Sequence, residues 1–287
     1  MIQEISPRKF HCEYHPEKKP VPDSFLLCFD KRGILFRVQK DTGRHDLPRI
    51  RDFMTSGSTD TDALSQVRYL FSIDENMFFL TENPDFSKSI PAEGFLFEPL
   101  LFLRTYEPQY LAFAAVTGSQ ISRFYRSHRF CGRCGKAMIH SEAERAMVCP
   151  GCGLTEYPKI SPAVIVAVRD GNRLLLTQNK RSTYPYRALI AGFVEIGETP
   201  EDTVHREVME EAGLRVKNVR LYKMQPWAFS DTLMIGFTAD LDGSDKITVQ
   251  KSELTDASWF DRKDVSSAPF NISIGHEMIT AFKNGEL

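Results

Sequence analysis

The chain has 287 residues, a formal net charge of −2 at pH 7 and 42% hydrophobic residues. This length accommodates one large domain or two ordinary ones, and the composition is typical of a soluble globular protein. The near-neutral charge argues against nucleic-acid binding by bulk charge, although local basic patches are compatible with it. Residues 1–19 lack the apolar core of a signal peptide, and no run approaches the ~20 apolar residues of a membrane span. We therefore expect a cytoplasmic protein with no membrane partner.

Residues 1–122 are predicted to form an α+β domain that carries no catalytic constellation. The expected elements are a hairpin over 24–40, helical segments near 49–54 and 65–69, buried elements at 77–82 and 95–103, and a helix from about Glu107 that is interrupted or ends near Gly118. His11, His15 and His45 are expected to lie on the surface or in loops, because none is spaced from a second ligand as metal sites require.

Four cysteines in the segment 123–157 have the spacing of a metal site. Cys131, Cys134, Cys149 and Cys152 form C-x2-C-x14-C-x2-C, and each pair is followed by a glycine that suits a tight turn. Four thiolates close a tetrahedral shell and leave no position for water, so the sequence predicts one structural zinc. His128 and His140 flank these pairs but are not expected to bind the metal.

A basic cluster lies around the first cysteine pair: Arg123, Arg126, Arg129, Arg133 and Lys136. Two interpretations remain open at this point. The cluster is either an ordinary solvated surface near a helix end or a local landing site for a polyanion such as the 5′ end of an RNA.

Residues 158–287 are predicted to form an α/β domain. Expected strands cover 162–170, 173–180, 188–195, 218–227, 231–241, 247–250 and 257–261, with a tight turn at 170–172 and a final helix at 274–283. A further helix begins at the cap Thr199, continues through Pro200 and ends at Gly213. This order indicates a mixed sheet sandwiched between helices.

That central helix concentrates carboxylates on one face. Glu207, Glu210 and Glu211 are spaced i, i+3, i+4 beside an apolar stripe of Val204, Val208 and Ala212. Acids at this spacing repel each other and oppose the helix dipole, and Arg206 relieves only part of the repulsion. The cluster makes physical sense if divalent cations neutralise it, because Mg²⁺ and Mn²⁺ prefer carboxylate oxygens.

The stretch 192–214 resembles the Nudix box. Every fixed position of the box is matched, by Gly192, Glu198, Arg206, Glu207, Val208, Glu210, Glu211, Gly213 and Leu214. The resemblance implies a Nudix α/β/α sandwich and hydrolysis of a nucleoside diphosphate linked to another moiety. It also implies that residues 1–122 are a degenerate Nudix-like domain.

The ribbon and a second motif resemble the NADH pyrophosphatase (NudC-type) branch, which carries S-Q-P-W-P-F-P-x-S after the box. Here Gln225, Pro226, Trp227 and Phe229 are in register, whereas four positions depart from the pattern: Met224, Ala228, Ser230 and Thr232. The resemblance implies hydrolysis of NAD(H) to NMN(H) and AMP, action on NAD-capped RNA and a homodimer. Gln225 and Trp227 would contact the substrate, and Phe193 and Tyr157 would sandwich the nicotinamide ring from two subunits.

The same resemblance implies roles for the acids. Glu207, Glu211 and Glu253 would be the principal ligands of catalytic Mg²⁺ or Mn²⁺, and Glu210 would be a ligand or the water-activating base. Glu198 would hold the loop or support the metal ligands from outside, and Arg206 would orient a carboxylate. The alternatives are a broader dinucleotide or ADP-ribose pyrophosphatase and, from another class, a zinc-ribbon nucleic-acid adaptor or nucleotide sensor.

Overall fold

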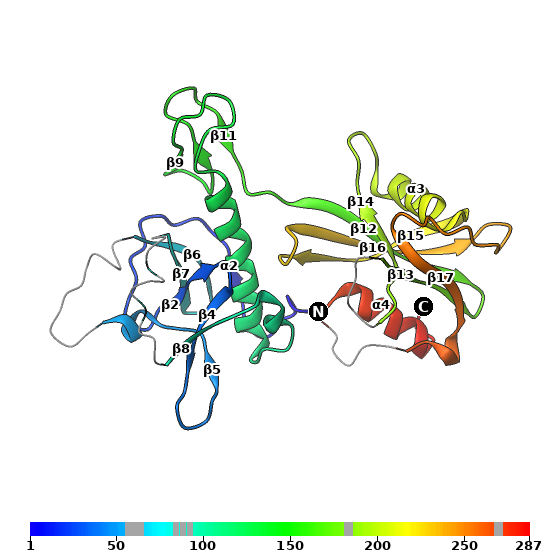
Figure 1. The fold of residues 1–287 in the computed structure, drawn as a ribbon, viewed down its shortest axis with the longest axis horizontal. Helices are drawn as coiled ribbons and strands as arrows, with labels where there is room; N and C mark the ends of the chain where they lie inside the picture. Colours follow the sequence, from blue (N-terminus) through cyan, green and yellow to red (C-terminus); the bar gives the residue numbers. More distant parts are fainter. Residues whose placement is uncertain (55–65, 83–85, 87–89, 91–93, 181–185, 267–271) are drawn as a thin grey trace. The chain divides into compact units, whose positions relative to one another are not determined.

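A computed structural model (Figure 1) describes residues 1–287 apart from 55–65, 83–85, 87–89, 91–93, 181–185 and 267–271. The chain forms two compact units. The N-terminal unit is Ile2–Lys159, and the C-terminal unit is Ile160–Leu287 together with Met1. The finer division into domains 1–122, 123–157 and 158–287 stays a prediction. Within the described ranges, none of the helices has the length and apolarity that crossing a membrane demands.

In the described part of the N-terminal unit, two small sheets precede one long helix in the chain, and a third sheet of short strands follows it. One sheet has the strand order β1-β6-β7-β2; the other has the order β3-β4-β5, with β8 also paired to β4. The elements are β1 (Phe10–His11), β2 (Phe25–Leu27), β3 (Phe29–Asp30), β4 (Gly33–Val38), β5 (His45–Asp46), the 3-10 helix η1 (Ile50–Phe53), β6 (Val67–Ile73), β7 (Asn76–Thr81), β8 (Phe95–Glu98), the 3-10 helix η3 (Leu100–Arg104) and α2 (Gln109–Ser127).

Several predictions for this unit need correction. The hairpin is confirmed for β3 and β4, but β2 leaves it and pairs parallel to β7 in the other sheet. The helix predicted over 65–69 is wrong from residue 67 onward, because Val67–Ile73 is a strand rich in β-branched and aromatic residues (Ser65 lies outside the described residues). His11 and His45 lie in short strands, and both are partly exposed.

The helix α2 continues through Gly118, where we expected it to stop. A Cβ at this position would lie 2.3 Å from Leu27 Cδ1, so the glycine allows α2 to pack closely on β2. The helix propensity lost at one glycine is about 1 kcal/mol, which burial of the surrounding side chains outweighs. Gly118 is therefore a packing residue.

The C-terminal unit is a mixed sheet with a helix on each face. The strand order is β15-β16-β12-β13-β17, with β14 also paired to β12, and β12 and β16 are parallel. The elements are β12 (Ser161–Asp170), β13 (Arg173–Asn179), β14 (Ile190–Phe193), α3 (Pro200–Ala212), β15 (Val216–Trp227), β16 (Thr232–Leu241), β17 (Leu254–Asp261), the 3-10 helix η4 (Arg262–Asp264) and α4 (Ile274–Asn284).

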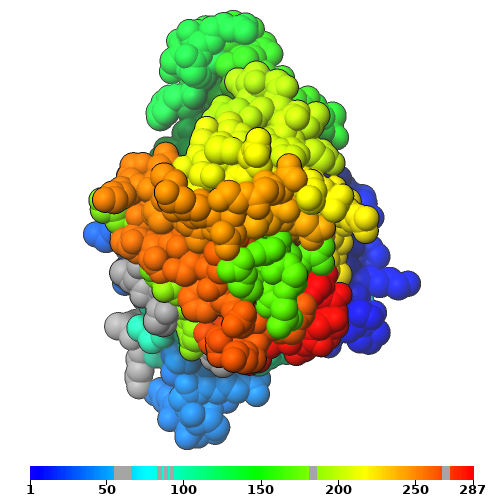
Figure 2. Space-filling view, turned by 90° about the vertical axis from the view of Figure 1, so that its right-hand side faces the viewer, coloured from blue at the N-terminus to red at the C-terminus, as the bar shows by residue number. Residues whose placement is uncertain are grey.

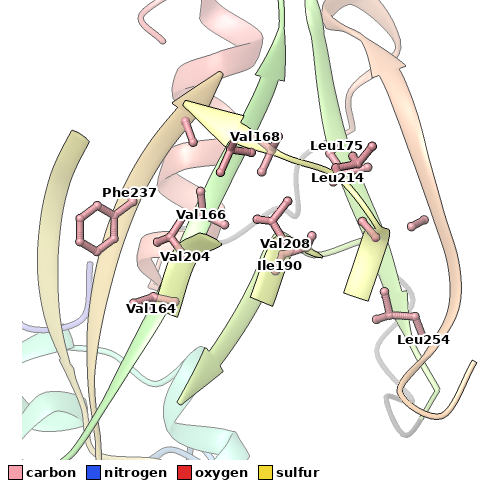
Figure 3. Close-up of a cluster of buried hydrophobic side chains, with 14 of the residues drawn as sticks. Val164, Val166, Val168, Leu175, Ile190, Val204, Val208, Leu214, Phe237 and Leu254 are labelled. Atoms are coloured by element: carbon pink, nitrogen blue, oxygen red, sulfur yellow. The ribbon is translucent and has the colours of Figure 1, made fainter. Parts of the chain in front are cut away.

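Successive side chains of β12 point alternately toward the two helices that cover the sheet. Val164, Val166 and Val168 face α3 and pack with Val204 and Val208, as Figure 3 shows. The residues between them on β12 face the other way and pack against α4. Successive side chains of a strand point to opposite faces, so one apolar strand serves two cores. The predicted α/β/α sandwich is confirmed.

Two local features of this unit position the site. β12 pairs along one edge with β13 at Arg169 and Asp170, and with β14 over Ala163–Val166. The chain after β14 therefore leads directly to α3. The strand predicted at 247–250 is absent, because the N–H groups of Thr248 and Gln250 donate to the carbonyls of Ala212 and Glu211 at the end of α3 (2.8 and 3.0 Å).

Candidate active site

The boundaries of α3 are those the sequence predicts. Thr199 Oγ1 accepts a hydrogen bond from the Asp202 N–H (3.1 Å), and the Thr199 N–H donates to Asp202 Oδ2 (3.2 Å). This reciprocal cap satisfies backbone donors that the first helical turn leaves free. Gly213 ends the helix with φ +68°, and its N–H donates to Met209 O (3.0 Å). The rotation and length of the acidic face are thereby set by local sequence.

Arg206 connects the loop after β14 to the helix. Its Nε and one NH group donate to the two oxygens of Glu198 (2.7 and 2.9 Å), and the same NH2 group reaches Phe193 O at 2.9 Å. The other NH group contacts Glu207 Oε1 at 2.8 Å and Glu210 Oε2 at 3.1 Å. The paired bonds from Arg206 lower the pKa of Glu198 to about 2. Glu198 is thus a permanent anion that holds the loop.

Two carboxylates of the helix are buried. The side chains of Glu207 and Glu211 belong to residues that are 8% and 5% exposed, whereas Glu210 is exposed. Burial, together with the charges of Glu207, Glu253 and Glu210, raises the pKa of Glu211 to about 8. The pKa of Glu207 is raised as well, mainly by burial, although Arg206 works in the opposite direction. A buried acid without enough positive charge around it is the electrostatic signature of a functional site.

Glu253 reaches this cluster through the segment that precedes β17. Its charge acts on both Glu207 and Glu211, although it is 42 positions beyond Glu211 in the chain. The segment 248–250 binds the end of α3 through its N–H groups, and Lys180 N–H holds Glu253 O (2.8 Å). Figure 2 shows the orange segment around residue 250 lying against yellow α3. Glu253 itself lies in an exposed turn before the strand.

Gly192 has a role that its motif position does not reveal. It lies in β14 opposite Val164, and a Cβ built on it would be 1.9 Å from Glu207 Oε1. The backbone of β14 and the carboxylate of Glu207 therefore occupy adjoining space. Only a residue without a side chain permits this approach. The contact between Arg206 and Glu207 gives the orienting role expected of Arg206 a specific partner.

The acids on and near α3 are oxygen donors of the kind that a hard divalent cation prefers. Within the described part of the chain, Glu211 makes no ion pair or hydrogen bond through its carboxylate, and Glu253 makes none either. Oxygen donors of this kind suit Mg²⁺ and Mn²⁺. The three acids Glu207, Glu211 and Glu253 thus form a set whose mutual repulsion a bound cation would relieve.

The four residues expected to bind substrate have different environments. Phe193 ends β14 beside the acids and is 56% exposed. Tyr157 belongs to the N-terminal unit, is also 56% exposed, and its hydroxyl donates to Glu144 Oε1 (2.9 Å). Trp227 ends β15 half-buried, with its ring 4.8 Å from that of Phe229.

Gln225 is fully buried, and its amide holds backbone groups. Its Nε2 donates to Ile272 O (2.9 Å), and its Oε1 accepts from the Ile274 N–H (2.7 Å) at the first residue of α4. The structure therefore places this side chain in support of the segment before α4. The signal available in the sequence, a glutamine within a motif, does not distinguish a contact to backbone from a contact to substrate.

The four cysteines of the ribbon meet at one point of the N-terminal unit. They lie in and around the small sheet of β9 (Ile139–His140), β10 (Met147–Val148) and β11 (Thr155–Glu156). All four sulfur atoms lie within 4.8 Å of one another. Tetrahedral zinc with bonds of about 2.3 Å needs sulfur atoms about 3.8 Å apart, so the cluster fits the metal closely.

Two matching turns create this cluster. Gly135 and Gly153 have φ of +73° and +72°, and each donates its N–H to the carbonyl of the first cysteine of its pair (both 2.9 Å). These turns aim backbone N–H groups at the sulfurs. Although burial works against it, N–H donors from Cys152 and Gly151 help to lower the pKa of Cys149 to about 6. The thiolate form that zinc binding requires is thereby favoured at Cys149.

Comparisons with known proteins agree with both parts of this structure. Residues 159–281 match the family model described as the NUDIX domain, and residues 126–157 match that of the NADH pyrophosphatase zinc ribbon domain. A protein named NAD-capped RNA hydrolase NudC from Chromobacterium violaceum is 39% identical over 217 residues, which cover 76% of this chain and 80% of the relative.

Other relatives match over a shorter length. A protein of the same name from Enterobacter sp. is 47% identical over 152 residues, covering 53% of this chain and 58% of the relative. A crystal structure of a NUDIX hydrolase from Nitrosomonas europaea has a TM-score of 0.48 and 24% identity, and covers 55% of this chain and 92% of that chain.

Proposed function

Because the chain belongs to the Nudix hydrolase family and carries the zinc ribbon of NADH pyrophosphatases, we propose that it hydrolyses the diphosphate of NAD(H) to NMN(H) and AMP. The observation that carries this proposal is the buried pair Glu207 and Glu211. The charge of Glu253 acts on both carboxylates, and too little positive protein charge neutralises them. Divalent cations bound together with a diphosphate would supply the missing positive charge, which accounts for the clustering of acids on α3.

The chain's own residues divide the work as follows. Glu207, Glu211 and Glu253 would hold the cation, and Arg206 with Glu198 fixes the loop and the rotation of Glu207. Mg²⁺ or Mn²⁺ at this position would stabilise the charge that develops on the phosphate oxygens and would acidify the attacking water. Glu210 is exposed beside these acids, which suits it to accept the proton from that water as general base, or to act as a further ligand.

Recognition of the nicotinamide depends on exposed aromatic rings. Phe193 presents more than half of its surface at the end of β14, beside the acids. Tyr157 of a second subunit would cover the opposite face of the ring, which makes the proposed enzyme a homodimer. Each such stack contributes about 1–3 kcal/mol. In this proposal Trp227 contacts the dinucleotide, and Gln225 acts by holding the backbone of 272–274 in place.

An NAD cap on RNA contains the same diphosphate, so we extend the proposal to the removal of NAD caps in the cytoplasm. The relatives named above carry this activity in their names. A broader action on ADP-ribose remains the second candidate, because Met224 and Ala228 depart from the motif and Ala228 is buried in the strand-to-loop segment. The two differ in whether the nicotinamide ring contributes to kcat/KM.

Product analysis tests this proposal. The protein is incubated with Mg²⁺ or Mn²⁺ and, under matched conditions, with NAD⁺, NADH, ADP-ribose, diadenosine polyphosphates or NAD-capped RNA. The products are then separated and identified by mass spectrometry. We expect NMN(H) and AMP from NAD(H) at the highest kcat/KM among the small molecules. Folded Glu211→Gln protein is the control for contaminating hydrolases. Turnover of ADP-ribose alone, or none of any dinucleotide, would contradict the proposal.

A further inference from the structure

A cavity of about 500 Å³ lies within the N-terminal unit, and its residues are separate from the acids of α3. Its walls come from the junction of β2 and β3, the end of β7, the second half of α2 and the zinc ribbon. Figure 1 shows α2 running from the sheets of this unit into the segment that carries the ribbon strands. The volume lies within the range of small-molecule sites.

Buried polar atoms without partners gather on the residues that line this cavity. Thr81 Oγ1, Tyr125 Oη and His140 Nδ1 are buried and have no hydrogen-bond partner among the described residues. Thr81 and Tyr125 are 9% and 5% exposed. Most buried polar groups in folded proteins are paired, because an unpaired group loses its bonds to water without replacement. Together with Glu82 Oε1, four such atoms belong to residues that line this one cavity.

The neighbouring acid is already neutralised, which leaves the cavity cationic. His140 Nε2 lies 2.9 Å from Glu82 Oε1, and Arg68 Nε donates to Glu82 Oε2 (3.2 Å). The other acid of the lining, Asp30, is bound by Arg32. By contrast, Arg126 and Arg129 line the cavity and make no ion pair within the described ranges. Two guanidinium groups without acidic partners favour a phosphate.

The lining also offers flat apolar surface. Phe29 belongs to it, and Phe130 is 65% exposed although it is a large aromatic residue. Aromatic rings of this kind stack on heterocycles. Nε2 of His140 is turned toward Glu82, so Nδ1 is its other ring nitrogen for a hydrogen bond, and the hydroxyls of Thr81 and Tyr125 can donate or accept. A ligand that uses all of these groups has a phosphate, a heterocycle and both donors and acceptors.

We propose that this cavity is a binding site for a nucleoside monophosphate. Arg126 and Arg129 bind the phosphate, an aromatic ring stacks on the base, and the buried hydroxyls and His140 bind the polar edge of the base or sugar. The zinc ribbon supplies Arg129, Phe130, Met138 and His140 to the lining, so the metal helps to build the site.

The test uses calorimetric titration of the full-length, zinc-loaded protein without added Mg²⁺ or Mn²⁺, with AMP, adenosine and inorganic phosphate as probes. We expect AMP to bind and the two fragments to bind at least about tenfold more weakly. Tyr125→Phe, Thr81→Val and Arg126→Ala should each weaken AMP binding by about tenfold. Arg133→Ala, a basic neighbour outside the lining, and Phe193→Ala, beside the acids of α3, should leave this binding unchanged.

Melting temperatures separate a binding role from a structural one. Tyr125→Phe removes a buried hydroxyl that has no partner, so the melting temperature without ligand should stay the same or rise. A marked fall would show that the hydroxyl stabilises the fold, and would overturn the assignment. Three further results would also overturn it: no heat from AMP at millimolar concentration, equal effects of Arg126→Ala and Arg133→Ala, and Arg126→Ala weakening a single-stranded RNA oligonucleotide but not AMP.

Discussion

The carboxylate of Glu207 lies where any side chain at position 192 would have to be, since a Cβ on Gly192 would come within 1.9 Å of Glu207 Oε1. The β14 backbone and the first buried acid of α3 are thus in direct contact across the loop. Arg206 strengthens the same junction by donating to both Phe193 O and Glu207 Oε1. The position of the Glu207 carboxylate therefore depends on Gly192, a residue with no side chain.

Gly192→Ala should therefore impair hydrolysis without unfolding the protein. The added methyl displaces the Glu207 carboxylate, and a ligand shifted by about 1 Å can cost about 10²-fold in rate. The measurement is kcat/KM for NADH together with the Mg²⁺ dependence. Gly132→Ala is the matched control, because a Cβ there meets nothing within 4 Å. Unchanged kinetics in Gly192→Ala would mean that the acid relaxes freely.

Glu211→Gln should lower kcat by at least about 10² and leave the fold intact, because it removes a charge that stabilises the transition state through the cation. Steady-state kinetics at saturating NADH and a circular-dichroism spectrum provide the measurement. The exposed acid Glu201 in the first turn of the same helix supplies the control Glu201→Gln. Near-wild-type turnover by folded Glu211→Gln protein would remove this helix from the mechanism.

The metal-free protein should lose stability as the pH rises from about 4.5 to about 8. The pKa of Glu211 is raised from its ordinary 4.5 to about 8. Between these values the folded state holds a proton that the unfolded state releases, so the free energy of unfolding falls with pH, by up to about 1.4 kcal/mol per pH unit. Below the ordinary value the contribution is fully present.

Urea denaturation at a series of pH values measures this slope. Glu211→Gln should flatten it, whereas Glu201→Gln should not. Added Mg²⁺ should restore stability at high pH, because the cation favours the ionised carboxylates. A slope of the opposite sign in metal-free wild type would contradict the burial-driven shift.

Purified protein should contain about one zinc per chain, held by the four thiolates. Cys149→Ser should lose the metal and lower the melting temperature by at least about 5 °C, because the ribbon is ordered by its cation. Elemental analysis and thermal denaturation measure these effects, and Cys12→Ser is the control because that cysteine is exposed and outside the cluster. Kcat per folded molecule should change less than stability does. Zinc-free protein that is fully stable would refute a structural metal.

Phe193→Ala should remove most of the preference for NADH over ADP-ribose. The ring is 56% exposed and free to stack on nicotinamide, which ADP-ribose lacks. Losing one stack of about 1–3 kcal/mol should lower kcat/KM for NADH by about 5- to 150-fold and spare ADP-ribose. Ile196→Ala, at the fully exposed tip of the same loop, is the control. Equal losses on both substrates would show that Phe193 supports the loop instead.

Local sequence by itself determined the features whose physics is local. The cap at Thr199, the stop at Gly213 and the acid face of α3 follow from spacing along one helix, because capping and 3.6-residue periodicity act within a few residues. The two cysteine pairs are determined in the same local way, because each forms a turn closed by a hydrogen bond from the glycine that follows it to the first cysteine. The hairpin turn at Gly171 and the alternating apolar side chains of β12 are also features that local sequence determines.

Only the tertiary structure decided which distant residues meet. The charge of Glu253 acts on Glu211 because residues 248–250, within a segment predicted to be a strand, bind the end of α3 instead. Gly192 accommodates Glu207 across a loop. Gly118 was expected to interrupt or end its helix, but it lets α2 pack closely against Leu27. Gln225 was expected to contact the substrate, but its amide group is hydrogen-bonded to the backbone of residues 272–274. These relationships depend on packing between segments far apart in the chain, and a single sequence carries no periodic signal for such contacts.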